Sequence, residues 1–321
     1  MAGTQLVAGI DLGGTKILSV CVSRDLTIAG RDLRPTDAGL GPDAVIARMA
    51  DSARAAYGGN TIAAAGISAP GPADLTRGIL TTPPNLPGWH NVPLARSIGG
   101  HLGVPTWLEN DANAAALAEH RLGAGRGSDH MILVTIGTGL GGGLILDGHL
   151  YHGASGAGGE IGHMQLEPEG RLCGCGRRGC LEALASGSAL DAAATDLAEA
   201  YPDGLIARLA QREGVTPDAR ILHLAAESGN AGADAAIHKA GRYLGAGLTN
   251  LVDVFNPQVI VIGGSLRKLG SRYLDTARAV VKAEAFPQSY ADVRILEAEL
   301  GDEAPAIGAA LLALDNISEG A

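Results

Sequence analysis

The sequence predicts an α/β protein built from two lobes. Strand-like apolar runs alternate with helical patterns along the chain, and the same strand–turn–strand unit occurs twice. At 321 residues, the chain is long enough for two domains with substantial cores. Because only 3% of the residues are aromatic, these cores must be built mainly from Ala, Leu, Ile and Val.

The first part of the chain is expected to alternate strands with helices. The expected strands cover residues 5–11, 16–22, 26–34, 62–67 and 104–109. A helical pattern over residues 43–57 ends at Gly58-Gly59. The stretch ISAPGPADLTRGILTTPPNLPGW is rich in Pro and Gly, so it predicts a long ordered loop of the kind that is usually functional. The segment DANAAALAEHRLG predicts an Ala-rich helix from Asp111 to Gly123.

The second part is expected to open with a hairpin over residues 130–150. Residues 186–250 are largely helical in pattern, and PQVIVIGGSL predicts a buried strand that runs into Gly263-Gly264. A helix, the strand VRILEAEL and a closing helix with Pro305 in its first turn follow. We expect an N-terminal lobe of residues 1–110, joined by the closing helix 305–318, and a C-terminal lobe of residues 111–304. With no low-complexity linker between them, the lobes should form a hinged pair around a cleft.

Charge and hydropathy exclude several classes of protein. The formal net charge is −10 and the longest basic run is a pair of arginines, so no basic stripe is available to bind nucleic acid. The apolar run from Met131 to Leu146 is too short for a bilayer, and the N-terminus lacks the basic region of a signal peptide. Together with the four cysteines, these features predict a cytoplasmic protein.

A glycine run in TIGTGLGGG matches G-x-G-x-x-G, the fingerprint of NAD-binding folds, at Gly137, Gly139 and Gly142. That fingerprint requires a strand before it and a helix after it. The strand HMILVTI is present, but GLILDGHLY follows as a second strand-like run that ends in a Asp147-Gly148 turn. The pattern therefore predicts a hairpin and excludes an NAD site.

The same layout occurs in QLVAGIDLGGTKILSVCV, around Gly13-Gly14-Thr15. The amides of such turns form concave nests for anions, and the Thr15 and Thr138 hydroxyls can add donors. Two nests facing each other would clamp a polyphosphate such as ATP, with Mg²⁺ supplying positive charge that the acidic chain lacks. The alternative is that both are simple tight turns.

The segment CGCGRRGC places Cys173, Cys175 and Cys180 close together among glycines. Soft thiolates favour tetrahedral Zn²⁺, which needs a fourth ligand, and His163 in GEIGHMQLEP is the nearest candidate. Such a site would be structural and would close the loop over residues 163–180. Free surface thiols are the alternative, and Cys21 is expected to be a buried strand residue.

Polar residues suited to a sugar flank these features. Asn110 and Asp111 lie at a predicted strand-to-helix junction, where Asp111 could also serve only as the helix N-cap. Glu160, His163 and Glu182 surround the cysteine loop, although an isolated carboxylate would by default be a solvated surface group. His163 could bind zinc with one ring nitrogen and a sugar hydroxyl with the other. With Asn85, these residues suit the many hydroxyls of a hexose.

Several motifs, in the same order, are similar to those of the ROK family of sugar kinases and repressors: DLGGTK, SAPGP…PPNLPGW, LENDANAAA, TIGTGLGGG, GEIGH and CGCGRRGCLE. The resemblance covers nearly the whole chain, and the cysteine motif with GEIGH is its most specific part. It implies a two-lobed actin-like ATPase fold, also called ribonuclease-H-like, with an ATP cleft between the lobes. The helical region 186–245 carries no usable signature.

The resemblance also implies roles for individual residues. Asp111 would be the catalytic base. The sugar would contact Asn85, Asn110, Asp111, Glu160, His163 and Glu182. Zinc would be bound by His163, Cys173, Cys175 and Cys180. Asp11 would lie near Mg²⁺, and the nucleotide would contact Gly13, Gly14, Thr15, Lys16, Thr138, Gly139, Gly263 and Gly264.

The implied activity is ATP-dependent phosphorylation of a hexose. PPNLPGW is similar to the loop of glucose-phosphorylating members, which favours transfer to glucose O6. N-acetylmannosamine, N-acetylglucosamine and fructose stay open as substrates. A sugar-responsive regulator is the rival, but family repressors carry a helix-turn-helix ahead of the first hairpin, and we expect no room for one before Gly13. A homodimer or dimer of dimers is the family expectation.

Overall fold

The computed structural model describes residues 5–319, and this part of the chain forms two compact units. Unit 1 contains the described residues up to Gly127, residues 143–159 and the described residues from Ala298 onward. Unit 2 contains residues 128–142 and 160–297. Unit 1 is thus assembled from three stretches of sequence. The predicted division into two hinged lobes, with boundaries at residues 110 and 305, stays a prediction.

Unit 1 is built on a mixed sheet with the strand order β3-β2-β1-β4-β7. Its strands are β1 (Leu6–Leu12), β2 (Lys16–Ser23), β3 (Ile28–Pro35), β4 (Ile62–Ala69) and β7 (Thr106–Asn110). β1, β2 and β3 form an antiparallel meander, whereas β4 runs parallel to β1 and β7 parallel to β4. The three parallel strands therefore end at one edge of the sheet, which is where open α/β sheets bind ligands.

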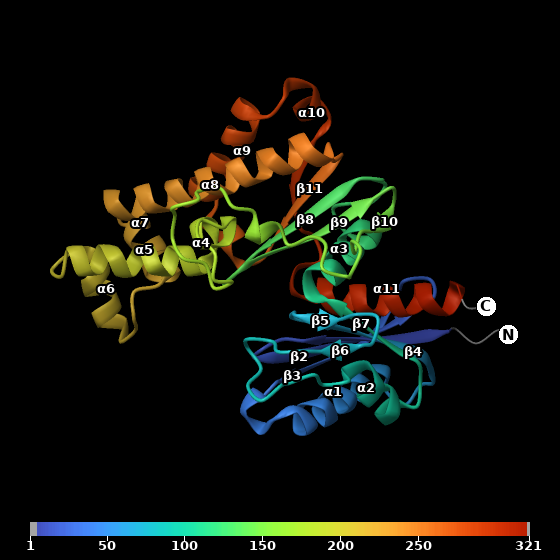
Figure 1. Cartoon of the computed structure of the whole chain (residues 1–321). Coiled ribbons are helices and arrows are strands. Elements are labelled where there is room, and N and C mark those ends of the chain that lie inside the picture. The colour runs from blue at the N-terminus through green and yellow to red at the C-terminus, as the bar shows by residue number, and fades with distance from the viewer. Residues whose placement is uncertain (1–4, 320–321) are drawn as a thin grey trace. The chain divides into compact units, whose positions relative to one another are not determined.

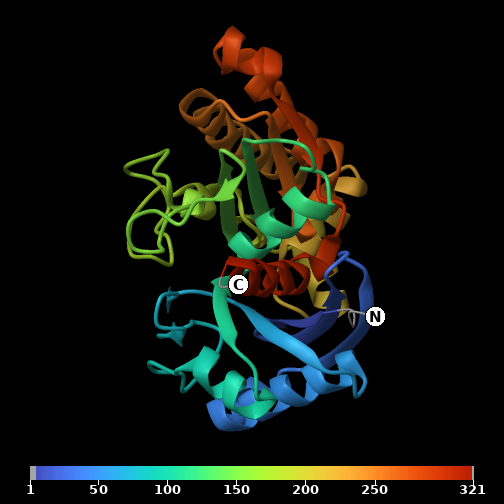
Figure 2. The ribbon, with the colours of Figure 1, turned by 90° about the vertical axis from the view of Figure 1, so that its right-hand side faces the viewer.

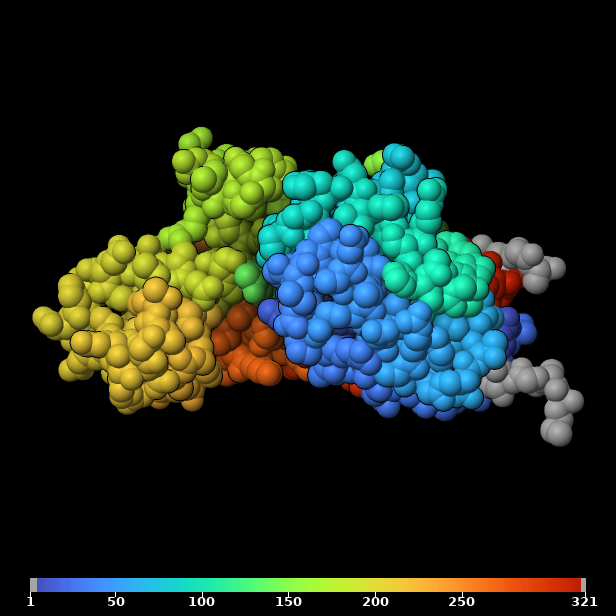
Figure 3. All heavy atoms as spheres, turned by 90° about the horizontal axis from the view of Figure 1, so that it is seen from below, coloured from blue at the N-terminus to red at the C-terminus, as the bar shows by residue number. Residues whose placement is uncertain are grey.

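Helices cover both faces of this sheet (Figures 1 and 2). α1 (Pro42–Tyr57) and α2 (Leu94–Leu102) lie on one face, and their side chains cover it in the space-filling view of Figure 3. α11 (Ala304–Glu319) packs against β1 and β4 on the other face, and α3 (Asp111–Leu122) packs on α11. The predicted Pro/Gly-rich loop contains a short hairpin of β5 (Ala73–Asp74) and β6 (Ile79–Leu80).

Glycines allow the backbone of α11 to pack directly against the backbone of the sheet. A Cβ atom at Gly9 would meet the carbonyl oxygen of Ala306, and one at Gly66 would meet that of Ala309. On the opposite side of the helix, a Cβ at Gly308 would meet the backbone of Ala114 in α3. A side chain at any of these three glycines would therefore separate the layers.

The second sheet has the strand order β10-β9-β8-β11-β12, and the boundary between the units falls within β9. Its strands are β8 (Met131–Ile136), β9 (Leu140–Leu146), β10 (His149–Leu150), β11 (Val259–Gly263) and β12 (Arg294–Glu297). β11 is parallel to both β8 and β12, and it is fully buried. The sequences of the central strands of unit 2 are continuous apolar runs, because parallel strands are buried on both faces of a sheet.

Helices make up most of the remainder of unit 2. They are α4 (Leu181–Ala185), α5 (Gly187–Ala200), α6 (Leu205–Glu213), α7 (Ala219–Glu227), α8 (Ala231–Phe255), α9 (Ser271–Glu284) and α10 (Pro287–Asp292). Within residues 5–319 there are also four 3₁₀ turns: η1 (Ala38–Leu40), η2 (Ile161–His163), η3 (Ser265–Leu269) and η4 (Gly301–Glu303). The helix α8 packs along α9 and also contacts α4, α5 and α7.

The α/β prediction and both predicted hairpins are confirmed, so Gly137 and Gly139 belong to a strand–turn–strand unit. The prediction of a largely helical region at residues 186–250 is also correct. The helix expected directly after Gly263-Gly264 is preceded by η3, and α10 was not predicted. None of the helices in the described part of the chain combines the length and apolarity that a membrane span requires.

Candidate active site

The ends of the parallel strands in unit 1 bring polar residues into register. Asp11 of β1 lies opposite Ser68 of β4, and Ser68 lies opposite Glu109 of β7. The Ser68 hydroxyl donates a hydrogen bond to Asp11 Oδ1 at 2.9 Å. The pKa of Asp11 is raised to about 7, because burial outweighs the Ser68 hydrogen bond, which lowers the pKa, and the negative charge of Asp111 contributes to the rise. The charged form of this buried carboxylate is therefore costly at neutral pH.

The junction between β7 and α3 positions Asn110 and Asp111. Asn110 is the N-cap of α3, since its Oδ1 accepts hydrogen bonds from the amides of Ala112 at 2.9 Å and Asn113 at 3.3 Å. The alternative that Asp111 serves only as the N-cap is therefore wrong, because Asp111 is the first residue of the helix. Its Oδ1 accepts from the Ala112 amide at 2.8 Å. The positive end of the helix dipole stabilises a negative charge at this position.

The first glycine turn lies beside the predicted sugar residue Asn85. A Cβ atom at Gly14 would lie 3.1 Å from the Cβ of Asn85. The Gly13 amide donates to the Lys16 carbonyl at 2.9 Å, and its own carbonyl accepts from the Thr36 hydroxyl at 2.7 Å. Because the Gly13 amide is used within the hairpin, an anion nest here would have to use the amides that follow it. Lys16 forms an ion pair with Asp302 at 2.7 Å.

The second glycine turn, in unit 2, is held by α5 and by Glu182. The Gly187 amide donates to the Gly137 carbonyl at 2.8 Å, and the Ser188 amide and hydroxyl donate to the Thr138 carbonyl at 3.0 and 2.6 Å. Gly264 has a φ of +89°, and a Cβ atom there would lie 2.2 Å from the Ile136 carbonyl oxygen and clash with it. The structure thus brings the predicted nucleotide residues Thr138, Gly139, Gly263 and Gly264 to one place in unit 2.

Glu182 lies between this turn and the cysteine cluster. Its Oε2 accepts a hydrogen bond from the Leu140 amide at 3.0 Å, and its Oε1 lies 3.5 Å from Cys173 Sγ. A Cβ atom at Gly139 would lie 2.6 Å from Glu182 Oε2, so a larger residue there would require the Glu182 carboxylate to shift. Glu182 therefore ties the second glycine turn to the cysteine loop, a role that the sequence did not predict.

His163, Cys173, Cys175 and Cys180 converge as predicted, with their ligand atoms all within 4.8 Å of one another. Cys173 Sγ lies 3.7 Å from His163 Nδ1, and Cys175 Sγ lies 3.7 Å from Cys180 Sγ. Zinc–sulfur bonds of about 2.3 Å place two sulfurs of a tetrahedral site about 3.8 Å apart. Three sulfurs and one nitrogen at these separations therefore fit a closed tetrahedral site for Zn²⁺.

The two ring nitrogens of His163 face different groups. Nδ1 is directed at the thiols, whereas Nε2 lies 4.0 Å from the exposed carboxylate of Glu160. The peptide of η2 fixes this arrangement, since the His163 amide donates to the Glu160 carbonyl at 3.0 Å. Nε2 is thus directed at the same space as Glu160, and both could bind a hydroxyl group.

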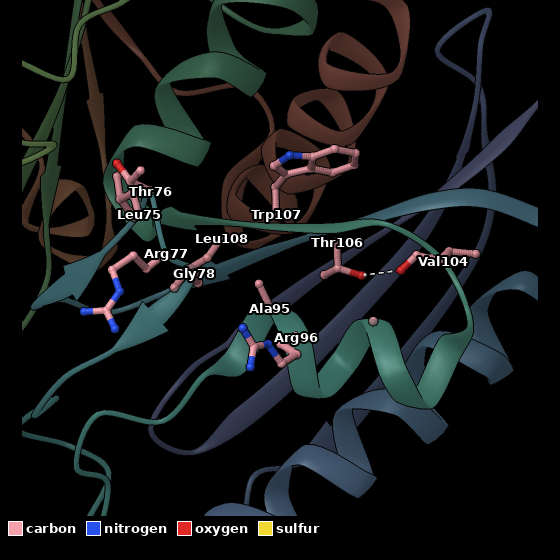
Figure 4. Close-up of a pocket in the computed structure, with 11 residues that line it drawn as sticks. Leu75, Thr76, Arg77, Gly78, Ala95, Arg96, Val104, Thr106, Trp107 and Leu108 are labelled. Atoms are coloured by element: carbon pink, nitrogen blue, oxygen red, sulfur yellow. Dashed lines mark hydrogen bonds between the residues drawn. The ribbon is translucent and has the colours of Figure 1, made fainter. Parts of the chain in front are cut away.

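A hollow of about 360 Å³ lies elsewhere in unit 1, between the loop over residues 75–78, α2 and β7 (Figure 4). Thr106 and Trp107 contribute from the beginning of β7, whereas Asn110 and Asp111 lie at its end. None of the predicted site residues lines this hollow. The candidate site is therefore defined by its side chains and not by this cavity.

Three residues beside the candidate site were missed by the sequence reasoning. Ser68 holds Asp11, and the buried Glu109 binds both the Asn110 amide and His152. Glu109 stands within the motif LENDANAAA, and His152 lies a few residues before GEIGH. A strand-end carboxylate directly before two polar cap residues was the available signal for Glu109. No local signal marks His152.

The fold and these sites define a class of protein. The sequence model of the ROK family matches residues 7–316, and the chain belongs to the ROK family. The chain is 35% identical over 309 residues to a glucokinase of Thermotoga maritima, covering 96% of this chain and 97% of that protein.

Solved structures agree with this assignment. A ROK hexokinase from Thermus thermophilus is 36% identical with a TM-score of 0.84, covering 98% of this chain and all of that one. A ROK glucokinase from Streptomyces griseus, in complex with glucose and AMPPNP, is 34% identical with a TM-score of 0.80, covering 97% and 99%. The chain therefore has the actin-like ATPase fold that the resemblance predicts.

Regulators of transcription are also among the similar proteins. The xylose repressor of Bacillus subtilis is 35% identical over 251 residues, which cover 78% of this chain and 61% of the repressor. Kinases and repressors thus share this fold, and the choice between them depends on the site.

Proposed function

We propose that this chain is an ATP-dependent hexose kinase that phosphorylates glucose at O6. The observation that carries the proposal is the junction of β7 and α3, where Asn110 caps the helix and presents Asp111 as its first residue. The full-length similarity to a glucokinase and to a ROK glucokinase bound to glucose and AMPPNP supports the substrates. N-acetylmannosamine, N-acetylglucosamine and fructose are the alternative acceptors.

Asp111 is proposed as the general base. It would accept the proton of the attacking hydroxyl while that oxygen bonds to the γ-phosphorus of ATP and ADP leaves. The transition state of phosphoryl transfer is loose, so a weak base suffices and most catalysis comes from positioning and charge neutralisation. Asp111 is partly exposed and close enough to Asp11 to raise its pKa, so the base lies beside the proposed cation site.

Sugar binding is proposed to use Asn85 and Asn110, and further contacts would come from Glu160, His163 and Glu182. The orientation of His163 supports this role, because Nε2 faces Glu160 while Nδ1 faces the thiols. Carboxylate and imidazole groups together provide the donors and acceptors that hexose hydroxyls require.

The nucleotide is proposed to bind at the glycine turns. Asp11 would hold Mg²⁺, whose charge offsets that of the phosphates and of the carboxylate itself. Gly13, Gly14, Thr15 and Lys16 would contact the phosphates, together with Thr138 and Gly139, while Gly263 and Gly264 would face adenosine. The Lys16–Asp302 pair is exposed and thus weak, so Lys16 can exchange this partner for a phosphate.

Zinc is proposed as a structural ion bound by His163, Cys173, Cys175 and Cys180. It would fix the loop over residues 163–180 and hold the His163 ring in one orientation. It takes no part in phosphoryl transfer in this proposal. We also propose a homodimer as the working assembly, with a dimer of dimers as the alternative, on the family resemblance alone.

The proposal is tested by a coupled assay of ADP release with ATP, Mg²⁺ and a panel of glucose, N-acetylmannosamine, N-acetylglucosamine, fructose and xylose. We expect the highest kcat/KM with glucose. No turnover with any sugar would reject the kinase function. In that case, specific sub-micromolar DNA binding at physiological salt that changes with sugar would support the regulator that the similarity to the xylose repressor suggests.

A further inference from the structure

Glu109 is a buried carboxylate at the end of β7, directly before the proposed sugar residue Asn110 and two residues before the proposed base. Only 2% of it is exposed. Its Oε1 accepts hydrogen bonds from the Asn110 amide at 2.9 Å and from the Asn113 side-chain amide at 3.0 Å. Its Oε2 lies 2.7 Å from His152 Nε2. Both oxygens of this buried group are therefore used.

The contacts of Oε1 fix the junction on both sides of Asp111. One donor is the backbone amide of Asn110, before it, and the other is the side chain of Asn113, in the first turn of α3. Asn110 in turn caps the helix through the amides of Ala112 and Asn113. Moving the Glu109 carboxylate would thus move the cap, the helix start and the carboxylate of Asp111 together.

His152 compensates the charge that this arrangement buries. A carboxylate removed from water costs several kcal/mol unless a charged partner or hydrogen-bond donors replace the water. His152 comes from the segment after β10, 43 residues away in the sequence, and its side chain is 39% exposed. The hydrogen bond to Glu109 raises the pKa of His152, whereas partial burial lowers it. The imidazolium form is thus favoured by Glu109.

We propose that the Glu109–His152 pair is a positioning unit that holds Asp111 and Asn110 in the geometry that phosphoryl transfer requires. The inference rests on the proposed kinase function. Neither Glu109 nor His152 is proposed to contact the sugar or the nucleotide. Misplacing a reacting group by about 1 Å costs on the order of 10²-fold in rate, so the pair should act on kcat.

The test compares four chains in the ADP-release assay: the unchanged chain, His152→Ala, His152→Gln and His149→Ala. Because His152 is partly exposed, water can fill the space left by Ala, and the fold should survive. The side-chain amide of Gln can donate the hydrogen bond that Glu109 Oε2 accepts. His149→Ala is the matched control, because this exposed histidine bonds through Nδ1 to the carbonyl oxygen of Asp147 and not to Glu109. Thermal unfolding verifies that each chain is folded.

We expect His152→Ala to lower kcat by about tenfold to a hundredfold, with KM for glucose and ATP changed by less than about threefold. His152→Gln should recover most of this loss, and His149→Ala should leave kcat unchanged. If His152→Ala does not fold, His152→Asn, whose shorter amide does not reach Glu109, takes its place.

Three results would overturn the inference while leaving the kinase function intact. The first is an unchanged kcat in His152→Ala. The second is a loss of kcat that Gln does not recover. The third is a rise in the KM for glucose at constant kcat, which would make His152 a sugar ligand. Absence of turnover in the unchanged chain would instead reject the proposed function, and this inference with it.

Discussion

The Ser68 hydroxyl of β4 donates a hydrogen bond to Asp11 of β1, with 2.9 Å between Ser68 Oγ and Asp11 Oδ1. This bond favours the charged form of Asp11, yet burial outweighs it and raises the pKa of Asp11 to about 7. The strand-end site thus contains a carboxylate that is costly to ionise in the absence of a cation.

Asp11→Asn should therefore stabilise the ligand-free protein above neutral pH. The pKa of Asp11 is about 7 in the folded state and near 3.8 in the unfolded state, so between these values the folded state binds the extra proton. Stability consequently falls as pH rises through this window, by on the order of 2–4 kcal/mol from this group. Asn has no such cost, so the variant should gain that amount at pH 8 and little near pH 4.

Urea unfolding of both chains at pH 4.5, 6 and 8, without Mg²⁺ or nucleotide, measures this difference. Asp203→Asn serves as the control, because Asp203 is exposed and its replacement should change stability little at any of these pH values. A difference between Asp11→Asn and the unchanged chain that does not vary with pH would contradict the raised pKa of Asp11.

The cysteine cluster predicts one bound zinc ion per chain. Cys175→Ser replaces a soft thiolate ligand, so it should lower the zinc content and the temperature of unfolding. Chelation of the unchanged chain should have the same effect on unfolding. Cys21→Ala is the comparison, because Cys21 is buried in β2, far along the sequence from the cluster. Elemental analysis of protein purified without chelator measures the metal, and zinc-free protein would reject the site.

The close packing of α11 on the sheet predicts opposite effects for two Gly→Ala substitutions. In Gly66→Ala, the new methyl group would collide with the Ala309 backbone, which should destabilise the fold by about 1–3 kcal/mol. In Gly100→Ala, within α2, the methyl group meets nothing within 4 Å, so the gain in helix propensity should stabilise by about 0.5–1 kcal/mol. If the two substitutions change the free energy of unfolding equally in a denaturation series, the contact between Gly66 and α11 is not tight.

The features that could be predicted from the sequence are those that neighbouring residues determine. Both hairpins were predicted because their turns need glycine at fixed places between apolar runs, and neighbouring strands then pair without help from distant residues. The metal cluster was predicted for the same reason, since three of its ligands lie within eight residues. The helix from Asp111 was placed correctly because Gly123 ends it and polar residues begin it.

The failures concern contacts that only the tertiary fold creates. The bond of Glu182 to the Leu140 amide was not predicted, because it depends on α4 lying against a turn 42 residues earlier, whereas the expected contact of Glu182 with a sugar stays a prediction. His152 and Glu109 meet only because the segment after β10 lies beside the end of β7. The sequence offered Asp111 as a possible N-cap, whereas the structure has Asn110 in that position. Asn and Asp have similar propensities for the N-cap, so propensity alone could not decide between these adjacent residues.

Asp111→Asn should separate the chemical step from sugar binding. The amide of Asn preserves the size and most hydrogen bonds of the side chain but cannot accept the hydroxyl proton. We expect kcat to fall by about 10²- to 10⁴-fold, which is the usual contribution of a general base, while the dissociation constant for glucose changes little. Steady-state kinetics and calorimetric titration with glucose measure the two quantities.

A second effect of Asp111→Asn does not depend on turnover. Because the negative charge of Asp111 raises the pKa of Asp11, its removal should lower that pKa and shift the pH dependence of stability toward acid. Urea unfolding of Asp111→Asn and of the double variant with Asp11→Asn detects this shift as a coupling between the two substitutions. A lowered kcat without coupling would show that the charge of Asp111 does not act on Asp11. Coupling with an unchanged kcat would place Asp111 beside the cation site but reject it as the base.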